Sequence, residues 1–254
     1  MDGITFFLSG DTGALRYAGE FLSTKGIPIV SAPSPKVTHL LLPVPSLDGK
    51  GLVRGGGAPE AILSQLSDRV VVMGGYLSHP AFQNYTKFDF LQDARYLAEN
   101  AAITADCALP ILGKHLPVIF SGCPILIVGW GRIGKCLAAR LKALHADVTV
   151  VARKESDRAA LISLDYAAIA PESLNHILPH CRAVVNTAPA PVIGRELAAL
   201  CPKGCVFLDL ASSPGICCEG VLWERGLPNR DAPESSGALI AQTALRLCQK
   251  EATP

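Results

Sequence analysis

The feature that most constrains this chain is a glycine-rich turn between an apolar strand and a helix. Residues 124–128, Pro-Ile-Leu-Ile-Val, run directly into Gly129-Trp130-Gly131-Arg132-Ile133-Gly134, a G-x-G-x-x-G pattern. The first glycine permits a tight turn, the second lets backbone N–H groups approach a pyrophosphate, and the third lets the helix pack closely on the strand. The helix N-terminus then favours the phosphates. The pattern predicts a dinucleotide-binding site.

The residues that follow complete a strand–helix–strand unit. Ile133, Leu137, Leu141 and Leu144 recur with helical spacing, and residues 147–151 form the next apolar strand. This context favours a Rossmann domain over an ordinary α/β turn that binds no nucleotide. All six residues of the glycine turn are therefore candidate cofactor ligands.

The end of the second strand bears on the choice of cofactor. NAD enzymes commonly place an acidic residue there for the ribose 2′-hydroxyl, whereas this chain has Ala152, Arg153 and Lys154. Arg forms paired charge-assisted hydrogen bonds with a phosphate, so the sequence favours NADP over NAD. The alternative is a solvated basic strand end, because surface Arg and Lys are common.

Composition excludes several classes of function. The chain has 254 residues, 49% of them hydrophobic, and a net charge of +1, so we expect two folded domains and no general attraction to nucleic acid or an anionic membrane. Its longest uncharged stretch, residues 116–131, is shorter than a membrane span and contains prolines.

The N-terminal apolar run lacks a basic leader, which favours the cytoplasm. The nine cysteines suit reduced thiols, and their spacing favours no metal site.

The first hundred residues alternate short apolar strands with helical segments, which predicts a flavodoxin-like parallel α/β domain. The strands are expected at 4–8, 27–30, 39–42 and 70–73, and the helices at 14–25 and 58–66. The later strands are expected at 183–186 and 206–210, and Ala238, Ala241, Leu245 and Cys248 mark one face of a C-terminal helix that packs back across the first domain. The predicted divisions are a substrate-side domain at 1–103, an interdomain helix at 104–117, the Rossmann domain at 118–233 and the C-terminal helix at 234–254.

Loops that follow strands carry the remaining candidate ligands, because open parallel sheets bind ligands beyond the carboxyl ends of their strands. We expect these loops to meet at one cleft. Asn186-Thr187-Ala188-Pro189 is a candidate for the nicotinamide end of the cofactor, with turn residues that satisfy their own backbone as the alternative. The candidate substrate ligands are Pro43, Pro45, Asp48, Thr104, Asp106, Ser212, Ser213 and Pro214. Thr104 and Asp106 also fit a helix N-cap and an acidic residue in the first helical turn.

Two residues are candidates for proton transfer. Asp209, at the end of a strand, either orients a loop or acts as a base. His79, in the loop after the fourth predicted strand, is either an acid–base group or an ordinary solvent-facing histidine.

Together these motifs resemble the family of bacterial dipicolinate synthase A subunits, which are two-domain relatives of the hydroxyacid dehydrogenases. The resemblance spans most of the chain, and its most specific motif is Leu-Asp-Leu-Ala-Ser-Ser-Pro-Gly at residues 208–215. The other matching motifs are Gly10-Asp11, Leu42-Pro43-Val44-Pro45, Asp48-Gly49, residues 99–110, the glycine turn and Asn186-Thr187-Ala188-Pro189.

The resemblance implies NADP-dependent oxidation of a dihydrodipicolinate-type intermediate of the lysine pathway to dipicolinate, the calcium-chelating acid of bacterial spores. It also implies a flavoprotein-like second component, the B subunit, in a hetero-oligomer, and the cytoplasm of a sporulating mother cell. The chain departs from the family after Gly10-Asp11, where the family has a basic residue nearer the aspartate and this chain has its first basic residue at Arg16, and at Ile216, where a glycine is usual. Another NAD(P)-dependent dehydrogenase of hydroxy or amino acids, and a non-catalytic NADP-binding subunit, remain alternatives.

Overall fold

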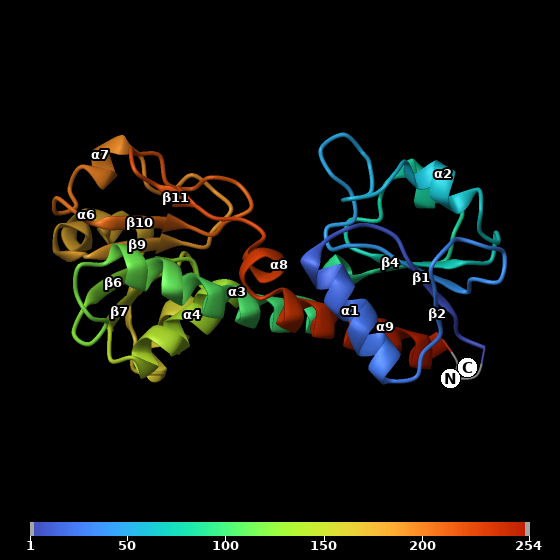
Figure 1. Ribbon diagram of the computed structural model, residues 1–254. Helices are drawn as coiled ribbons and strands as arrows, with labels where there is room; N and C mark the ends of the chain where they lie inside the picture. The colour runs from blue at the N-terminus through green and yellow to red at the C-terminus, as the bar shows by residue number, and fades with distance from the viewer. Residues whose placement is uncertain (1–2, 252–254) are drawn as a thin grey trace. The chain divides into compact units, whose positions relative to one another are not determined.

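The computed structural model describes residues 3–251 and divides into two compact units (Figure 1). The first unit comprises Met1–Ile103 with Pro228–Pro254, and the second comprises Thr104–Leu227. Each unit contains one parallel β-sheet. The predicted α/β class with two parallel sheets is confirmed.

The first unit has a five-stranded sheet in the order β2-β1-β3-β4-β5, the flavodoxin-like order. Its strands are β1 (Phe6–Leu8), β2 (Ile29–Val30), β3 (His39–Leu41), β4 (Val71–Gly74) and β5 (Lys87–Asp89). Its helices are α1 (Gly13–Thr24), α2 (Pro59–Leu63), the first part of α3 (Ala94–His115) and α9 (Pro233–Glu251), with short 3-10 helices at Pro80–Phe82 and Phe90–Gln92.

Alternation along the strands buries both faces of this sheet. In β3, Leu41 packs into the cluster that holds α1 and α9, whereas Leu40 packs into the cluster that holds α2. Successive strand side chains point to opposite faces, so an uninterrupted apolar run is what a sheet covered on both sides requires.

The second unit has a six-stranded sheet in the order β11-β10-β9-β6-β7-β8, which is the Rossmann order. Its strands are β6 (Pro124–Val128), β7 (Asp147–Val151), β8 (Ala167–Ile169), β9 (Ala183–Asn186), β10 (Val206–Asp209) and β11 (Leu222–Trp223). Its helices are α4 (Arg132–Ala143), α5 (Glu155–Ser163), α6 (Leu174–Ile177) and α7 (Arg195–Ala198), with 3-10 helices at Pro171–Ser173 and Leu178–His180, and α8 (Leu227–Asp231) follows.

The C-terminal helix α9 packs back against α1 in the first unit, as predicted (Figure 1). Its buried face is offset from the predicted one: Ala241 and Cys248 are buried, but Ala238 and Leu245 are only half-buried. Ile240, Ala244 and Leu247 fill the core instead. The offset arises because α9 approaches α1 most closely at Gly237, where an added Cβ would lie 2.5 Å from the Ala14 carbonyl oxygen, and this turns the face that carries Gly237, Ile240 and Ala244 inward.

The expected helix N-cap at Thr104 is wrong. Helix α3 begins at Ala94, so Thr104 is a buried residue in its interior and Asp106 is an exposed one. The true N-cap interactions come from Asp93, whose carboxylate accepts a hydrogen bond from the Tyr96 N–H at 2.8 Å. Strand β5 was also not expected, because Lys87-Phe88-Asp89 is short and carries two charges.

Candidate functional site

The turn after β6 has the backbone that the glycine pattern predicts. Gly129 has a φ of +107°, a conformation that L-residues other than glycine rarely adopt. At Gly134, an added Cβ would lie 2.2 Å from the Gly129 carbonyl oxygen, so this glycine lets α4 pack against the turn. At Gly131, an added Cβ would meet nothing within 4 Å, which leaves the backbone open to a ligand.

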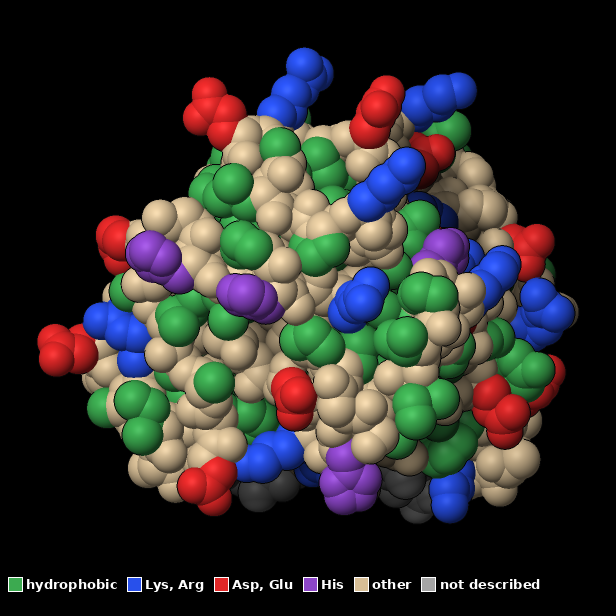
Figure 2. All heavy atoms as spheres, turned by 90° about the vertical axis from the view of Figure 1, so that its left-hand side faces the viewer, with side chains coloured by type: hydrophobic (Ala, Val, Ile, Leu, Met, Phe, Trp, Pro, Cys, Tyr) green, Lys and Arg blue, Asp and Glu red, His purple; other side chains and the backbone are tan. Residues whose placement is uncertain are grey.

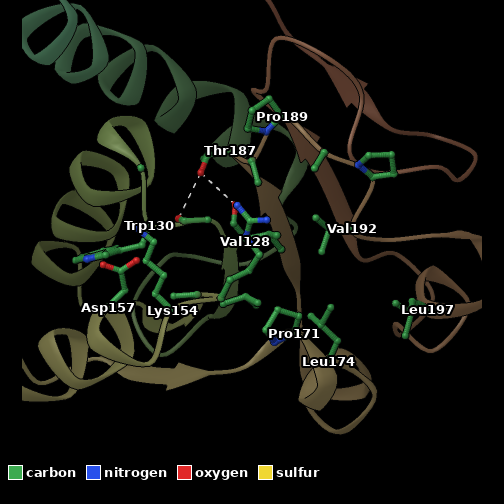
Figure 3. Close-up of a pocket in the computed structure, with 18 residues that line it drawn as sticks. Val128, Trp130, Lys154, Asp157, Pro171, Leu174, Thr187, Pro189, Val192 and Leu197 are labelled. Atoms are coloured by element: carbon green, nitrogen blue, oxygen red, sulfur yellow. Dashed lines mark hydrogen bonds between the residues drawn. The ribbon is translucent and has the colours of Figure 1, made fainter. Parts of the chain in front are cut away.

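A hollow of about 640 Å³ lies beside this turn, at the carboxyl ends of β6, β7 and β9 (Figure 3). This volume is within the range of small-molecule sites. The hollow lies where the chain order of the sheet reverses between β6 and β9, which is where doubly wound sheets bind dinucleotides. Its lining comprises Val128, Gly129, Trp130, Gly131, Val151, Ala152, Arg153, Lys154, Asp157, Pro171, Leu174, Thr187, Ala188, Pro189, Ala190, Pro191, Val192 and Leu197.

The walls of this hollow differ in character. Trp130, Lys154 and Asp157 lie together on one side, and Leu174 and Val192 lie on the other (Figure 3). The charged wall suits phosphates and sugar hydroxyls, while the apolar wall suits a flat ring.

Of the predicted cofactor residues, nine line the hollow: Gly129, Trp130, Gly131, Ala152, Arg153, Lys154, Thr187, Ala188 and Pro189. Arg132 and Ile133 lie in the first turn of α4 outside the lining, and Gly134 is buried behind the turn. Arg153 and Lys154 are exposed.

The end of β7 is held by a residue that the sequence pattern did not single out. The Arg158 guanidinium donates to the carbonyl oxygens of Ala152 and Arg153, at 2.8 and 2.7 Å. This fixes the backbone that carries the two cations. An Arg four residues beyond a basic strand end, on the following helix, is the signal that could have identified it.

Asn186 does not lie open to the hollow. It is fully buried, and its amide donates to the Asp209 carboxylate at 2.8 Å and to the Ala188 carbonyl at 3.0 Å. Its side-chain oxygen accepts from the Ala188 N–H. The side-chain groups that were expected to reach a cofactor therefore shape the Thr187–Pro189 loop. Thr187 donates its hydroxyl to the Val128 carbonyl at 3.1 Å.

Asp209 is the centre of this buried network. Besides Asn186, its carboxylate accepts from the backbone N–H groups of Ala211, Gly215 and Ile216 at 2.7–3.0 Å. Of the two interpretations of Asp209, these contacts favour the loop-orienting one. They leave the candidates Ser212, Ser213 and Pro214 exposed on the loop.

The other predicted site residues lie elsewhere. His79 accepts a hydrogen bond from the Ala81 N–H through Nδ1, which caps the 3-10 helix Pro80–Phe82. Asp106 pairs with Arg140 of α4. In the first unit, Pro43 is buried and Pro45 follows a cis peptide bond. The Asp48 carboxylate accepts from the N–H groups of Lys50 and Leu52, which lowers the pKa of Asp48.

Comparisons with known proteins agree with this architecture. Residues 114–214 match the family model of the D-isomer specific 2-hydroxyacid dehydrogenase NAD-binding domain. The chain is 25% identical over 235 residues to the A subunit of dipicolinate synthase of Bacillus subtilis, covering 85% of this chain and 79% of that protein. The resemblance to the dipicolinate synthase A subunits is confirmed. The match to an NAD-binding domain supports a nicotinamide cofactor and an oxidoreductase-like role.

Solved structures share the fold. The crystal structure of the dipicolinate synthase A subunit from Bacillus halodurans superposes with a TM-score of 0.83 at 22% identity, covering 96% of this chain and 97% of that one. The corresponding crystal structure from Bacillus subtilis also gives 0.83, at 18% identity, covering 98% and 97%.

Two further findings concern the residues that the structure describes. None of their helices is long and apolar enough to span a bilayer. No three of their His, Cys, Asp or Glu side chains are arranged so that they could hold a metal ion.

The face shown in Figure 2 has acidic and basic side chains interspersed.

Proposed function

We propose that this chain is the NADP-binding component of a dipicolinate synthase, which oxidises a dihydrodipicolinate-type intermediate of the lysine pathway to dipicolinate. The observation that carries the proposal is a Rossmann hollow with two exposed cations at the end of β7, in a chain similar over most of its length to the dipicolinate synthase A subunits. A flavoprotein-like partner corresponding to the B subunit, the cytoplasm of a sporulating mother cell and an oligomeric assembly belong to the same proposal.

The residues of the hollow fit the cofactor. The open backbone at Gly131 suits the pyrophosphate, Arg153 and Lys154 suit the 2′-phosphate, and Leu174 with Val192 suits the adenine ring. When bound, NADP supplies the hydride acceptor. Oxidation of the dihydropyridine ring also releases a proton, and we propose that water takes it, since Asp209 is buried and His79 caps a local turn.

The decisive experiment mixes the purified chain with NADP and freshly generated dihydro precursor, with and without a flavoprotein-like partner. We expect pyridine dicarboxylate, detected by its ultraviolet absorption together with NADPH, only in the complete mixture. Absence of product in both mixtures, with NADP binding measured separately, would exclude the synthase activity.

The cofactor site has a matched pair of variants. Gly131→Val places its side chain in open space, so we expect the protein to fold and to lose NADP binding. Gly194→Val also enters open space, outside the hollow, and should bind NADP like the wild type. Retained NADP affinity in Gly131→Val would reject the site.

The position of Asp157 favours NAD, because its carboxylate lines the hollow beside Lys154 and suits ribose hydroxyls. Selection of NADP and selection of NAD predict opposite effects of substitutions on the two affinities. If the cations select NADP, Arg153→Ala with Lys154→Ala weakens NADP binding by roughly 10- to 100-fold and NAD binding much less. If Asp157 selects NAD, Asp157→Asn weakens NAD binding more than NADP binding. Calorimetric titration with both cofactors distinguishes these outcomes.

A non-catalytic NADP-binding protein is the second candidate function. It is favoured by the hydrogen bonds that engage both proton-transfer candidates, Asp209 and His79, in local structure. NADP binding without turnover in the presence of the partner would support it.

A further inference from the structure

The first unit carries an ordered loop at the carboxyl edge of its sheet, residues 46–57, hereafter the edge loop. The order β2-β1-β3-β4-β5 reverses direction between β1 and β3, and doubly wound sheets bind ligands outside the carboxyl ends of the strands at such a reversal. The edge loop begins after β3 and packs onto the turn that follows β1, through the Asp11 N–H, which donates to the Arg54 carbonyl at 3.0 Å. It therefore lies at the place where this sheet should bind a ligand.

Hydrogen bonds within the edge loop give it a fixed shape. Ser46 is buried, and its hydroxyl donates to the Pro43 carbonyl and accepts from the Gly75 N–H, both at 2.9 Å. Leu47 and Val53 pair in an antiparallel bridge. The Asp48 carboxylate accepts from the backbone N–H groups of Lys50 and Leu52, so this predicted substrate ligand also fixes the tip of the loop.

Two glycines let the edge loop approach the turn after β1 more closely than other residues allow. A Cβ on Gly55 would lie 2.5 Å from the Asp11 backbone nitrogen, and a Cβ on Gly10 would lie 2.8 Å from the Arg54 carbonyl oxygen. Both glycines have positive φ, +70° and +127°. The backbone of Arg54 is thus held from both sides.

The side chain of Arg54 is held at one end and open at the other. Its Nε donates to the Leu47 carbonyl at 3.1 Å, and its backbone N–H donates to Ser46. Within residues 3–251, Arg54 forms no ion pair, although Asp11 and Asp48 are both near it. A guanidinium anchored through Nε keeps its two terminal NH₂ groups for a carboxylate, in the forked geometry that Arg and carboxylate share.

We propose that Arg54 is the carboxylate-binding residue of the first unit and that the edge loop positions it for a planar dicarboxylate. The inference rests on the proposed function, because it names the group that recognises the substrate. The predicted substrate ligands of the first unit, Pro43, Pro45 and Asp48, carry no positive charge. Arg54 supplies the exposed cation that a carboxylate ligand requires.

The test measures binding of isophthalate, a planar 1,3-dicarboxylate, and of dipicolinate to the full chain by calorimetric titration. Arg54→Met should weaken both by about 10- to 100-fold, and Arg54→Lys should give an intermediate loss because it keeps the charge but not the fork. Arg69→Met is the matched control, since Arg69 is an exposed cation that precedes β4, at the opposite edge of the sheet, and should leave both affinities unchanged.

Glycine variants test the positioning separately from the charge. Gly55→Ala should weaken isophthalate binding although Arg54 is retained, whereas Gly57→Ala, whose Cβ meets nothing within 4 Å, should not. Circular dichroism and melting curves show whether each variant is folded. Equal affinities for wild type and Arg54→Met, or no binding by the wild type, would overturn the proposal.

Failure of this inference and failure of the proposed function give different results. If Arg54→Met loses isophthalate binding but the complete mixture forms no dipicolinate, the carboxylate site stands and the synthase activity fails. If the mixture forms dipicolinate and Arg54→Met leaves the KM of the dihydro precursor unchanged, the activity stands and the role of Arg54 fails.

Discussion

Asp209 shows how a single buried carboxylate shapes the loop at residues 211–216. It accepts four hydrogen bonds, three of them from backbone N–H groups, in a fully buried position. Gly215 packs so closely here that an added Cβ would lie 2.3 Å from the Asn186 amide nitrogen. The hydrogen bonds of this loop therefore explain the motif at residues 208–215, the most specific one of the sequence.

We predict that Asp209→Asn lowers the free energy of unfolding by roughly 2–3 kcal/mol, because an amide cannot accept all four hydrogen bonds and leaves buried donors unpaired. Urea unfolding followed by circular dichroism measures the loss. Ser213→Ala, on the exposed part of the same loop, is the control and should leave stability unchanged. Equal stability of Asp209→Asn and wild type would contradict the assigned role.

Site residues could be predicted from the sequence where backbone geometry alone placed them. The glycine pattern predicted the turn that places Gly129, Gly131 and the end of β7 beside one hollow, because the spacing dictates the turn; their binding of a cofactor stays a prediction. Asn186 was misjudged, since its partner Asp209 lies on a neighbouring strand and only the register of β9 with β10 brings them together. The position of Arg54, which we propose as a carboxylate ligand, depends on hydrogen bonds within the edge loop and to the turn after β1, which no local sequence pattern specifies.

At the scale of elements, helices α1 and α9 pack at a close approach made by small residues. A Cβ on Gly237 would lie 2.5 Å from the Ala14 carbonyl oxygen and 2.6 Å from the Tyr17 Cβ. Glycine lowers the stability of a helix interior relative to alanine, so the presence of Gly237 in the second turn of α9 reflects this contact.

We predict that Gly237→Ala destabilises the protein by roughly 1–3 kcal/mol, because overpacking outweighs the better helix propensity of alanine. Gly113→Ala in α3 is the opposite case, since its Cβ would meet only Phe120 at 3.7 Å, and should be neutral or stabilising. Thermal unfolding of the two variants measures the contrast. A stabilised Gly237→Ala would show that the two helices separate without cost.

The start of α3 is tied to α9 by Asp93 and Arg246, whose carboxylate and guanidinium lie 2.8 Å apart. Burial raises the pKa of Asp93, but hydrogen bonds from the Tyr96 N–H and from Arg246 outweigh it, and the net pKa lies below the usual 3.8. The carboxylate thus stabilises the fold fully above pH 3.8, and this contribution is lost as the pH falls through the lowered pKa of the folded state.

We predict that Asp93→Asn lowers the free energy of unfolding by roughly 1–2 kcal/mol at neutral pH, the usual value of an N-cap. The difference from wild type should shrink as the pH falls below 3.8, as measured by urea unfolding across a pH series. Asp68→Asn, at an exposed position, is the control. A difference that stays constant with pH would contradict the ionic origin of the effect.

Element boundaries were predicted less well than element order. Helix α3 begins at Ala94, ten residues before the predicted start at Thr104, and so crosses the predicted domain boundary at residue 103. Strand β5 has no apolar run, and only pairing with β4 defines it. In β5, contacts with a distant part of the chain thus override the local pattern.

At the scale of the whole molecule, the two proposed binding surfaces lie in different units. The nucleotide hollow lies within Thr104–Leu227, and the edge loop lies within Met1–Ile103. A ligand that binds one folded unit stabilises that unit by mass action, by about 2.7 kcal/mol at a concentration of 100 times its Kd. Cofactor and dicarboxylate should therefore slow amide hydrogen exchange in different units.

We predict that NADP slows amide hydrogen exchange in peptides covering the turn after β6, the end of β7 and the Thr187–Val192 loop, whereas isophthalate slows it in the edge loop. Exchange followed by mass spectrometry measures both in the full chain, and Gly131→Val should lose only the NADP effect. Protection of the edge loop by NADP alone would show that one ligand acts on both units. That result would replace two independent sites with a coupled one, in which cofactor binding prepares the first unit for its dicarboxylate.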